Sequence, residues 1–371
     1  MSPERREAMQ QFLNGAGWGG AALSPLPGDA STRHYIRLAR DGRRALLMDQ
    51  PQDAEAPHCP PGATPEERQA LGYNAVARLA GADCGRFVAA AEYLRGKGLS
   101  APLIYATDVK QGFVLIEDLG DELYADVLAR AEGGEQALYS AAVEALAKLH
   151  AEEAPRALRD KPLHPYDDVA LLAETDLMTE WFMPVALGRA ASEDERLEHR
   201  QLWKRVLRPV LDAAPVFVHR DYHAQNLFWL PERQGVGRVG VIDFQDAVAG
   251  AKSYDLISLL EDARRDVAPA LAEAMTRRYL EAMGHAGLEV DEERYRAEMA
   301  VMAAQRNAKI AGIFARLYKR DGKPRYLSYL PRVWTYLDRD LEHPALAPLK
   351  RWYDKRIPGE ARHEALAGAA A

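Results

Sequence analysis

The stretch HRDYHAQN, residues 219–226, places strongly polar side chains between two apolar runs. The run APVFV precedes it and the run LFWL follows it, and each of them is typical of a buried strand. Burying polar groups inside a sheet costs free energy unless they are hydrogen-bonded or needed for function. The chain therefore needs a structural or chemical reason to hold these side chains between two strands.

The spacing within this stretch supplies that reason. It matches H-R-D-x-x-x-x-N, the catalytic loop of kinases. The apolar strand VGVIDF then ends at Asp243, and the intervening turn PERQGVGR makes a hairpin plausible. A polar surface hairpin is the alternative, but the second motif at hairpin distance favours a kinase.

Phosphoryl transfer needs a carboxylate that orients or accepts the attacking hydroxyl, and oxygen ligands that hold magnesium on the triphosphate. We therefore predict Asp221 as the catalytic base, and Asn226 and Asp243 as magnesium ligands. We expect His219 to hold the loop by packing and hydrogen bonding rather than to take part in the chemistry.

The distribution of strand and helix patterns along the chain predicts an α+β fold with two lobes and a cleft between them. The sequence pattern of residues 1–118 predicts about five strands with a few helices, which would form a small β-rich N-lobe. Residues 119–371 predict long helices, which form a larger C-lobe that carries the catalytic loop. Within residues 52–82, a Pro-rich loop precedes a helix that Thr64 caps and Gly81 ends.

Composition limits the partners. The formal net charge of −7 argues against nucleic acid as a bulk partner. Neither Cys59 nor Cys84 belongs to a CxxC pair, so we expect no zinc site and no disulfide framework. No apolar run approaches the length of a membrane span, and the N-terminus lacks the apolar core of a signal peptide. We expect a cytoplasmic protein that binds small molecules and needs no obligate protein partner.

The string VFVHRDYHAQNLFW, followed by VIDFQDAVAGAKSYDLISLL, resembles the aminoglycoside phosphotransferase family. This resemblance implies a protein-kinase-like two-lobed fold, with ATP and Mg²⁺ as cofactors. It also implies a structural role for Asp255, which would brace the catalytic loop from the start of a helix. A simple acidic residue near the helix N-cap is the alternative, and the two interpretations are compatible.

Further strings, among them LPGDASTRHYIRL and QRNAKIAGIFARLYKRDGKPRYLSYLPRVWTYL, are similar to the amino-sugar kinases of peptidoglycan recycling in this family. The likeness covers nearly the whole chain except residues 52–82, which look like an insertion, and the last dozen residues. It implies phosphorylation of the anomeric hydroxyl of N-acetylmuramate and N-acetylglucosamine. Two alternatives stay open: a kinase of an aminoglycoside, choline or homoserine, and a non-catalytic kinase-like nucleotide-binding module.

On the nucleotide side, the turn GDASTR offers Gly28, Ala30 and Ser31, whose small side chains let backbone N–H groups approach phosphates. An ordinary hairpin is the alternative. In the segment VLIEDLG, we expect the backbone of Glu117 and Leu119 to meet the adenine as an interlobe hinge.

Kinases usually carry a phosphate-binding lysine on a strand of the N-lobe. Residues 1–96 contain no lysine, and Met48 occupies the expected position. Arg33 is our first candidate for the missing cation and Arg37 the second, with ordinary surface arginines as the alternative.

A sugar site needs hydrogen-bonding groups and an apolar or aromatic platform. Arg306 lies in a mostly apolar helix, where it belongs either to a solvated stripe or to a clamp for the lactyl carboxylate of N-acetylmuramate. Trp181 offers a ring, although a tryptophan in a helix is more often part of the core. The full set of candidate acceptor contacts is Tyr222, His223, Gln225, Asp246, Trp181, Arg306 and Asn307.

Overall fold

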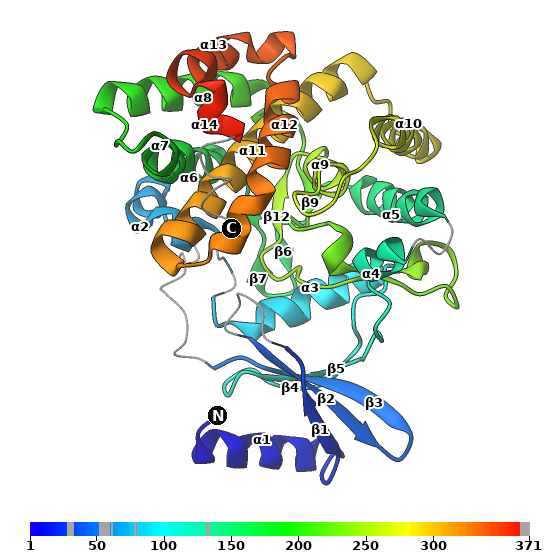
Figure 1. Ribbon diagram of the computed structural model, residues 1–371. Coiled ribbons are helices and arrows are strands. Elements are labelled where there is room, and N and C mark those ends of the chain that lie inside the picture. The colour runs from blue at the N-terminus through cyan, green and yellow to red at the C-terminus, as the bar shows by residue number, and fades with distance from the viewer. Residues whose placement is uncertain are drawn as a thin grey trace.

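The structure is a computed structural model that describes residues 1–27, 33–51, 60, 62–77, 79, 81–130 and 134–363. A sheet-containing N-lobe lies against a larger, mainly helical C-lobe (Figure 1). This is the α+β, two-lobed architecture that the sequence predicts. None of the helices in the described ranges is both long and apolar enough to cross a membrane.

The N-lobe contains one antiparallel sheet with the strand order β1-β2-β3-β5-β4. The turn between β2 and β3 has positive φ at Asp41 (50°) and Gly42 (74°), as a type I′ hairpin turn requires. The predicted series of strand, turn and strand is therefore confirmed. The five strands are β1 (Ala22–Pro25), β2 (His34–Arg40), β3 (Arg43–Asp49), β4 (Ile104–Asp108) and β5 (Phe113–Ile116).

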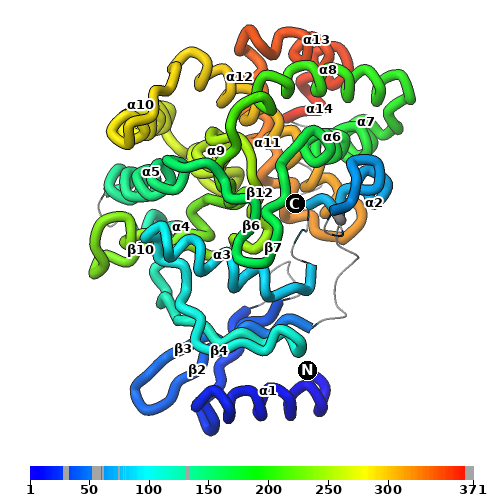
Figure 2. Tube along the Cα trace, turned by 180° about the vertical axis from the view of Figure 1, so that it is seen from behind, coloured from blue at the N-terminus to red at the C-terminus, as the bar shows by residue number. Residues whose placement is uncertain are grey.

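Two helices cover the two faces of this sheet (Figure 1, Figure 2). Helix α1 (Pro3–Gly15) packs on the face to which Leu47 points, and α3 (Cys84–Gly96) packs on the face to which Met48 points. Alternate residues of a strand point to opposite faces, so one strand serves both clusters. Helix α3 thus lies between the sheet and the C-lobe.

The expected insertion contains helix α2 (Pro65–Ala77), which packs against the C-lobe beside α6 (Asp168–Leu177) (Figure 1, Figure 2). Its predicted N-terminal capping box is present: the Thr64 hydroxyl accepts from the Glu67 N–H at 3.2 Å, and the Glu67 carboxylate accepts from the Thr64 N–H at 2.8 Å. The helix ends at Ala77 rather than at Gly81, and the chain breaks from helical geometry at Gly72.

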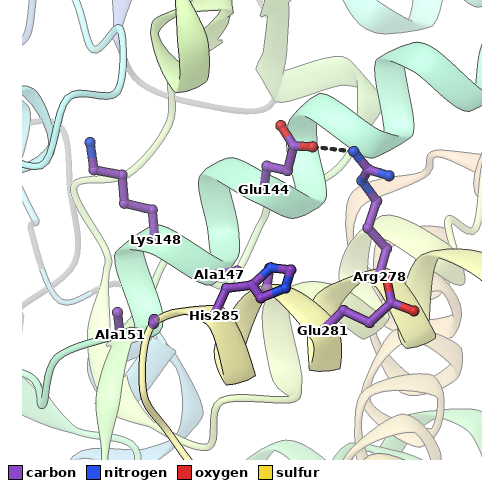
Figure 3. A pocket seen from close by; sticks show the side chains of 9 residues that line it. Glu144, Ala147, Lys148, Ala151, Arg278, Glu281 and His285 are labelled. Atoms are coloured by element: carbon purple, nitrogen blue, oxygen red, sulfur yellow. Dashed lines mark hydrogen bonds and ion pairs between the residues drawn. The ribbon is translucent and has the colours of Figure 1, made fainter.

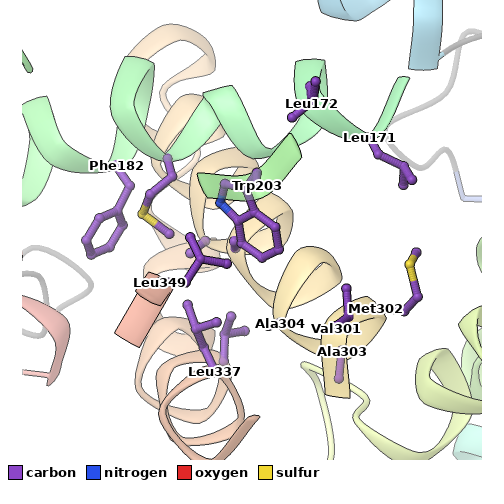
Figure 4. Packing of buried hydrophobic residues seen from close by; sticks show 14 of the residues in the cluster. Leu171, Leu172, Phe182, Trp203, Val301, Met302, Ala303, Ala304, Leu337 and Leu349 are labelled. Atoms are coloured by element: carbon purple, nitrogen blue, oxygen red, sulfur yellow. The ribbon is translucent and has the colours of Figure 1, made fainter. Parts of the chain in front are cut away.

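The core of the C-lobe surrounds helix α11 (Glu292–Asp321), where Trp203, Phe182 and Leu337 pack around small residues such as Ala303 (Figure 4). The other helices of this lobe are α4 (Tyr124–Ala129), α5 (Glu135–His150), η1 (Met178–Phe182, a π-helix), α7 (Met183–Leu187), α8 (Glu193–Leu211), α9 (Tyr254–Leu260), α10 (Pro269–His285), α12 (Leu330–Asp340), α13 (Ala347–Arg356) and α14 (Gly359–His363).

Short strands and 3-10 turns frame the catalytic loop. The predicted hairpin is confirmed, with Leu227 paired to Val241 in antiparallel register. The strands are β6 (Ala157–Leu158), β7 (Lys161–Pro162), β8 (His164–Pro165), β9 (Val216–Val218), β10 (Leu227–Trp229), β11 (Val239–Val241) and β12 (Val248–Gly250). The 3-10 turns are η2 (Ala224–Asn226), η3 (Gly235–Arg238), η4 (Pro324–Tyr329) and η5 (Pro344–Leu346).

Candidate active site

The catalytic loop runs from the end of β9 to the start of β10, so that the polar residues of the opening motif lie beyond the buried strands. Arg220 and Asp243 both have a positive φ, of 76° and 64°, which is uncommon for residues other than glycine. Such backbone strain persists where surrounding contacts hold it, and it is concentrated at functional sites.

Two side chains hold the loop. The Asp255 carboxylate accepts hydrogen bonds from the backbone N–H groups of His219 (2.6 Å) and Arg220 (2.9 Å). The His219 ring accepts at Nδ1 from the N–H of Asp221 (3.2 Å), so its Nε2–H donates to the Ile242 carbonyl (2.9 Å). These are the contacts of a structural brace, the role expected of both side chains.

The predicted metal ligands lie beside the predicted base. Asn226 donates its amide N–H to the carbonyl of Asp221 at 2.9 Å, which leaves its amide oxygen as the atom suited to a cation. The Asp243 carboxylate accepts from Gln245 at 3.0 Å and lies 3.5 Å from the Arg33 guanidinium. Oxygen atoms of a carboxylate and an amide are ligands that Mg²⁺ prefers.

Positively charged side chains act on the carboxylates of Asp221 and Asp243. Desolvation raises the pKa of Asp243, although its side chain is partly exposed; the Arg33 cation opposes that rise, and the negative Asp221 adds to it. Desolvation acts to raise the pKa of Asp221, but the nearby groups led by Lys309, with His223 and Arg220, together outweigh it, so the pKa is lowered. A base with a lowered pKa is ionised at neutral pH.

Lys309 belongs to a buried ionic network that the sequence did not reveal. Its Nζ lies 2.9 Å from the Glu174 carboxylate and 3.2 Å from the Tyr254 hydroxyl. The same carboxylate accepts from Arg220 at 2.8 Å and from Gln305 at 3.0 Å. Two cations share one carboxylate here, so the pKa of Glu174 is lowered despite its desolvation.

On the nucleotide side, Gly28, Ala30 and Ser31 lie outside the described residues. Arg33 lies at the cleft beside Asp243, where a phosphate-binding cation is needed. The guanidinium of Arg37, the second candidate, binds Asp118 (2.8 Å) and Asp121 (2.7 Å), so it ties β2 to the hinge. Met48 is fully buried.

The hinge has the polar groups expected for adenine. The Glu117 N–H donates to the Leu103 carbonyl at 2.8 Å, and the Glu117 carboxylate binds Arg233 at 2.5 Å. Within the described ranges, the Glu117 carbonyl and the Leu119 N–H have no protein partner. An adenine ring offers a complementary donor and acceptor.

Sequence reasoning missed Arg86 of α3, which lines a small cavity together with Phe244 and Gln245. Desolvation lowers the pKa of Arg86 against the electrostatic effect of Asp246 and Asp83. Its Nε is buried and lacks a hydrogen-bond partner within the described part of the chain. A buried arginine at the start of a helix gives no signal in a single sequence, because its neighbours come from distant segments.

On the acceptor side, three of the expected contacts have side chains that are hydrogen-bonded within the protein. The buried Tyr222 hydroxyl donates to the Ala142 carbonyl at 2.9 Å, away from the cleft. Arg306 donates to the Glu261 carbonyl (3.0 Å) and to the Ser258 hydroxyl (3.1 Å), which holds the end of α9. Asn307 donates to two buried carboxylates, those of Glu261 (2.7 Å) and Asp340 (2.9 Å).

Of the other expected contacts, His223 and Gln225 lie in the catalytic loop itself, between β9 and β10. His223 is buried, and desolvation lowers its pKa to about 4, which keeps the ring neutral. Its Nδ1 has no hydrogen-bond partner among the described residues. Gln225 is exposed, Asp246 accepts from Gln245 at 3.3 Å, and Trp181 lies on the π-helix η1, where its ring is partly exposed.

A separate groove of about 490 Å³ lies between α5 and α10 (Figure 3). It is lined by charged side chains of both signs, with Glu144 paired to Arg278 across it. None of the predicted site residues lines this groove. The groove therefore lies apart from the predicted catalytic residues.

This arrangement is found in known proteins. Residues 22–297 match the profile of the Phosphotransferase enzyme family, and the chain belongs to that family. The protein is an ATP-dependent phosphotransferase.

Two relatives are named N-acetylmuramate/N-acetylglucosamine kinase. The relative from Caulobacter vibrioides is 45% identical, and the alignment covers 98% of this chain and 99% of that protein. The relative from Pseudomonas putida is 32% identical, with 92% of this chain and 91% of that protein covered.

Solved structures show the same fold at low sequence identity. A microcompartment-associated aminopropanol kinase superposes with a TM-score of 0.57 at 15% identity, covering 90% of this chain and 98% of that one. An aminoglycoside phosphotransferase solved with ADP bound superposes with a TM-score of 0.54 at 16% identity, covering 94% and 99%. The protein-kinase-like two-lobed fold that the resemblance implied is confirmed.

Proposed function

We propose that this protein transfers the γ-phosphoryl group of ATP to the anomeric hydroxyl of N-acetylmuramate and N-acetylglucosamine. The product is the sugar 1-phosphate, and the reaction serves peptidoglycan recycling in the cytoplasm. The observation that carries the proposal is the 45% identity, over 98% of the chain, to a relative named for these two sugars. The grouping of Asp221, Asn226 and Asp243 at one cleft supports it.

In this proposal, Asp221 orients the acceptor hydroxyl and takes up its proton as the oxygen bonds to the γ-phosphorus. An anomeric hydroxyl is more acidic than an ordinary alcohol, so a carboxylate with a lowered pKa is basic enough. The Asp255 and His219 hydrogen bonds keep the Asp221 backbone in place during this step.

The residues present fit a magnesium ion. The Asp243 carboxylate and the Asn226 amide oxygen would hold it, and it would neutralise charge on the phosphate oxygens of the nucleotide. Arg33 lies beside Asp243 and would add a cation on the phosphate side, in place of the usual lysine. The backbone of Glu117 and Leu119 would meet the adenine.

The test is an ATP-consumption assay with N-acetylmuramate, N-acetylglucosamine, choline and kanamycin as acceptors, with phosphorus NMR of the product. We expect turnover with the two amino sugars and an anomeric phosphate signal. Asp221→Asn should lower kcat roughly a thousandfold, because the proton acceptor is lost. Asp41→Asn, at an exposed turn whose positive φ asparagine tolerates, is the matched control.

Turnover with choline or kanamycin alone would contradict the proposed acceptor. Turnover with none of the four, together with nucleotide binding by calorimetry, would favour a non-catalytic module. An Asp221→Asn enzyme with near-wild-type turnover would overturn the base assignment.

A further inference from the structure

The buried side chain of Gln245 contacts the predicted metal ligand Asp243. Its amide N–H group donates to Asp243 Oδ1 at 3.0 Å and to Asp246 Oδ2 at 3.3 Å. Ionised carboxylates can only accept hydrogen bonds, so these two contacts fix the orientation of the amide. The amide nitrogen faces the carboxylates, and the amide oxygen, Oε1, faces away from them.

The contacts of Asp243 explain why this orientation matters. Gln245 and Arg33 both meet the same carboxylate oxygen, Oδ1, at 3.0 Å and 3.5 Å. The other oxygen, Oδ2, has no partner among the residues that the structure describes, so it is the atom suited to a cation. Asp243 also has a left-handed φ of 64°, a strained conformation that needs surrounding contacts to hold it.

Two buried polar atoms lie on the other side of Gln245. One is the acceptor Gln245 Oε1, and the other is the donor Arg86 Nε of helix α3. Gln245 is 5% exposed and Arg86 is 9% exposed. Neither atom has a hydrogen-bond partner within the described ranges, whereas nearly all buried polar groups in folded proteins have one.

One small cavity joins these two side chains. Arg86 and Gln245 line the same cavity of about 10 Å³. Most of the remaining lining is apolar and includes Phe244 and Leu163. This volume is about the size that a single water molecule requires. A water molecule here would accept a hydrogen bond from Arg86 Nε–H and donate one to Gln245 Oε1, which satisfies both atoms.

Helix α3 is anchored well enough to form the other end of such a link. It packs against strands β6 and β7 of the C-lobe (Figure 1), and Lys161 of β7 binds Asp83, the N-cap of the helix, at 2.8 Å. Phe87, next to Arg86, stacks on Phe244 with 4.9 Å between the ring centroids. Neighbouring residues of α3 thus meet the two residues that directly follow the predicted metal ligand.

We propose that Gln245 is a positioning residue for the metal ligand Asp243, and that Arg86 holds Gln245 through one bound water molecule. The amide keeps Oδ1 occupied and leaves Oδ2 for the cation, and the water keeps the amide from rotating away from the carboxylates. The inference rests on the proposed function, because it requires that Asp243 binds Mg²⁺. It deepens that function by naming the residues that orient this ligand.

The experiment measures how tightly the ADP-bound protein binds Mn²⁺, a paramagnetic substitute for Mg²⁺, by electron paramagnetic resonance. Gln245→Met keeps the length of the side chain and removes the amide, so we expect the dissociation constant of Mn²⁺ to rise roughly 10- to 100-fold. The affinity for ADP without metal, measured by calorimetry, should stay at the wild-type value. Gln201→Met, at an exposed position of α8, is the matched control and should bind Mn²⁺ as the wild type does.

Two substitutions of Arg86 separate its hydrogen bond from its charge. Arg86→Met removes both, whereas Arg86→Lys keeps a positive charge and loses the Nε–H group. If the water transmits the effect, both variants should weaken Mn²⁺ binding roughly 2- to 10-fold, the effect of one lost hydrogen bond. The double variant of Arg86→Met with Gln245→Met should bind Mn²⁺ no more weakly than Gln245→Met alone. The single Arg86 variants also test the link if Gln245→Met does not fold.

The outcomes separate this inference from the proposed function. Wild-type Mn²⁺ affinity in Gln245→Met, or an equal loss of metal-free ADP affinity, overturns the positioning role of Gln245. Wild-type Mn²⁺ affinity in Arg86→Lys, or additive losses in the double variant, overturns the link through water. Asp243→Asn is the reference for the proposed function: if it binds Mn²⁺ as tightly as the wild type, the metal assignment itself fails.

Discussion

Arg220 joins the backbone of the catalytic loop to the tertiary structure around it. Its left-handed φ of 76° costs a residue with a Cβ about 1 kcal/mol. The guanidinium contacts with Glu174 and the Ala77 carbonyl hold the side chain in place and offset that cost. A glycine would adopt this φ freely, so the arginine is present for its side chain.

At position 220, we expect glycine to be a less destabilising substitution than alanine. Arg220→Gly and Arg220→Ala remove the same contacts, but only alanine keeps the left-handed strain. We expect the glycine variant to have a free energy of unfolding about 1 kcal/mol higher than the alanine variant. Urea denaturation measures both. An alanine variant of equal or greater stability would show that the loop relaxes out of this conformation.

Helix α11 illustrates how an element positions a site through small residues. Ala303, Ala304 and Gly312 let neighbouring segments approach its axis closely. The approach at Gly312 brings η1 against the helix, and with it Trp181 next to Arg316. A helix with larger side chains on this face would hold the two elements apart.

A single methyl group tests this packing. In Gly312→Ala, the new Cβ meets Leu177 side-chain and backbone atoms at 2.5–2.8 Å, so we expect a loss of about 1–3 kcal/mol in the free energy of unfolding. Gly284→Ala in α10 is the matched control, because nothing lies within 4 Å of its Cβ. That control should be neutral or slightly stabilising. A Gly312→Ala protein as stable as the control would contradict the close approach.

At the scale of the whole molecule, a buried histidine far from the cleft links stability to pH. His199 of α8 accepts at Nε2 from Trp203 (2.9 Å), and it also lies 3.1 Å from the Tyr353 hydroxyl of α13. Desolvation lowers its pKa from 6.5 to about 3, so the folded protein holds the ring neutral. The unfolded chain protonates near pH 6.5, which makes the folded state lose stability as the pH falls below that value.

Below pH 6.5, the neutral His199 should lower the free energy of unfolding by about 1.4 kcal/mol per pH unit. This decrease continues until about pH 3, where the folded state also binds the proton. Between pH 7 and pH 5, wild-type protein should lose about 2 kcal/mol more of its unfolding free energy than His199→Gln does. Guanidinium denaturation at both pH values gives the difference. His285→Gln, on the exposed end of α10, should behave like the wild type; equal losses in wild type and His199→Gln would refute the prediction.

Features set by neighbours in the chain were predictable from the sequence alone. The spacing of Asp221, Asn226 and Asp243 identifies the reaction class, because the loop and its hairpin fix these side chains within a short segment. The two lobes and the Thr64 capping box follow from periodicity and local hydrogen bonding in the same way.

Only the tertiary structure decided how the charged side chains are used. Arg306 and Arg316 lie on one helix and look alike in the sequence, yet one holds the end of α9 and the other meets Tyr73 and Trp181. Likewise, the partners of Lys309 come from other segments of the chain. The long-range packing of these segments sets which partners each cation meets, and periodicity within a single helix carries no information about it.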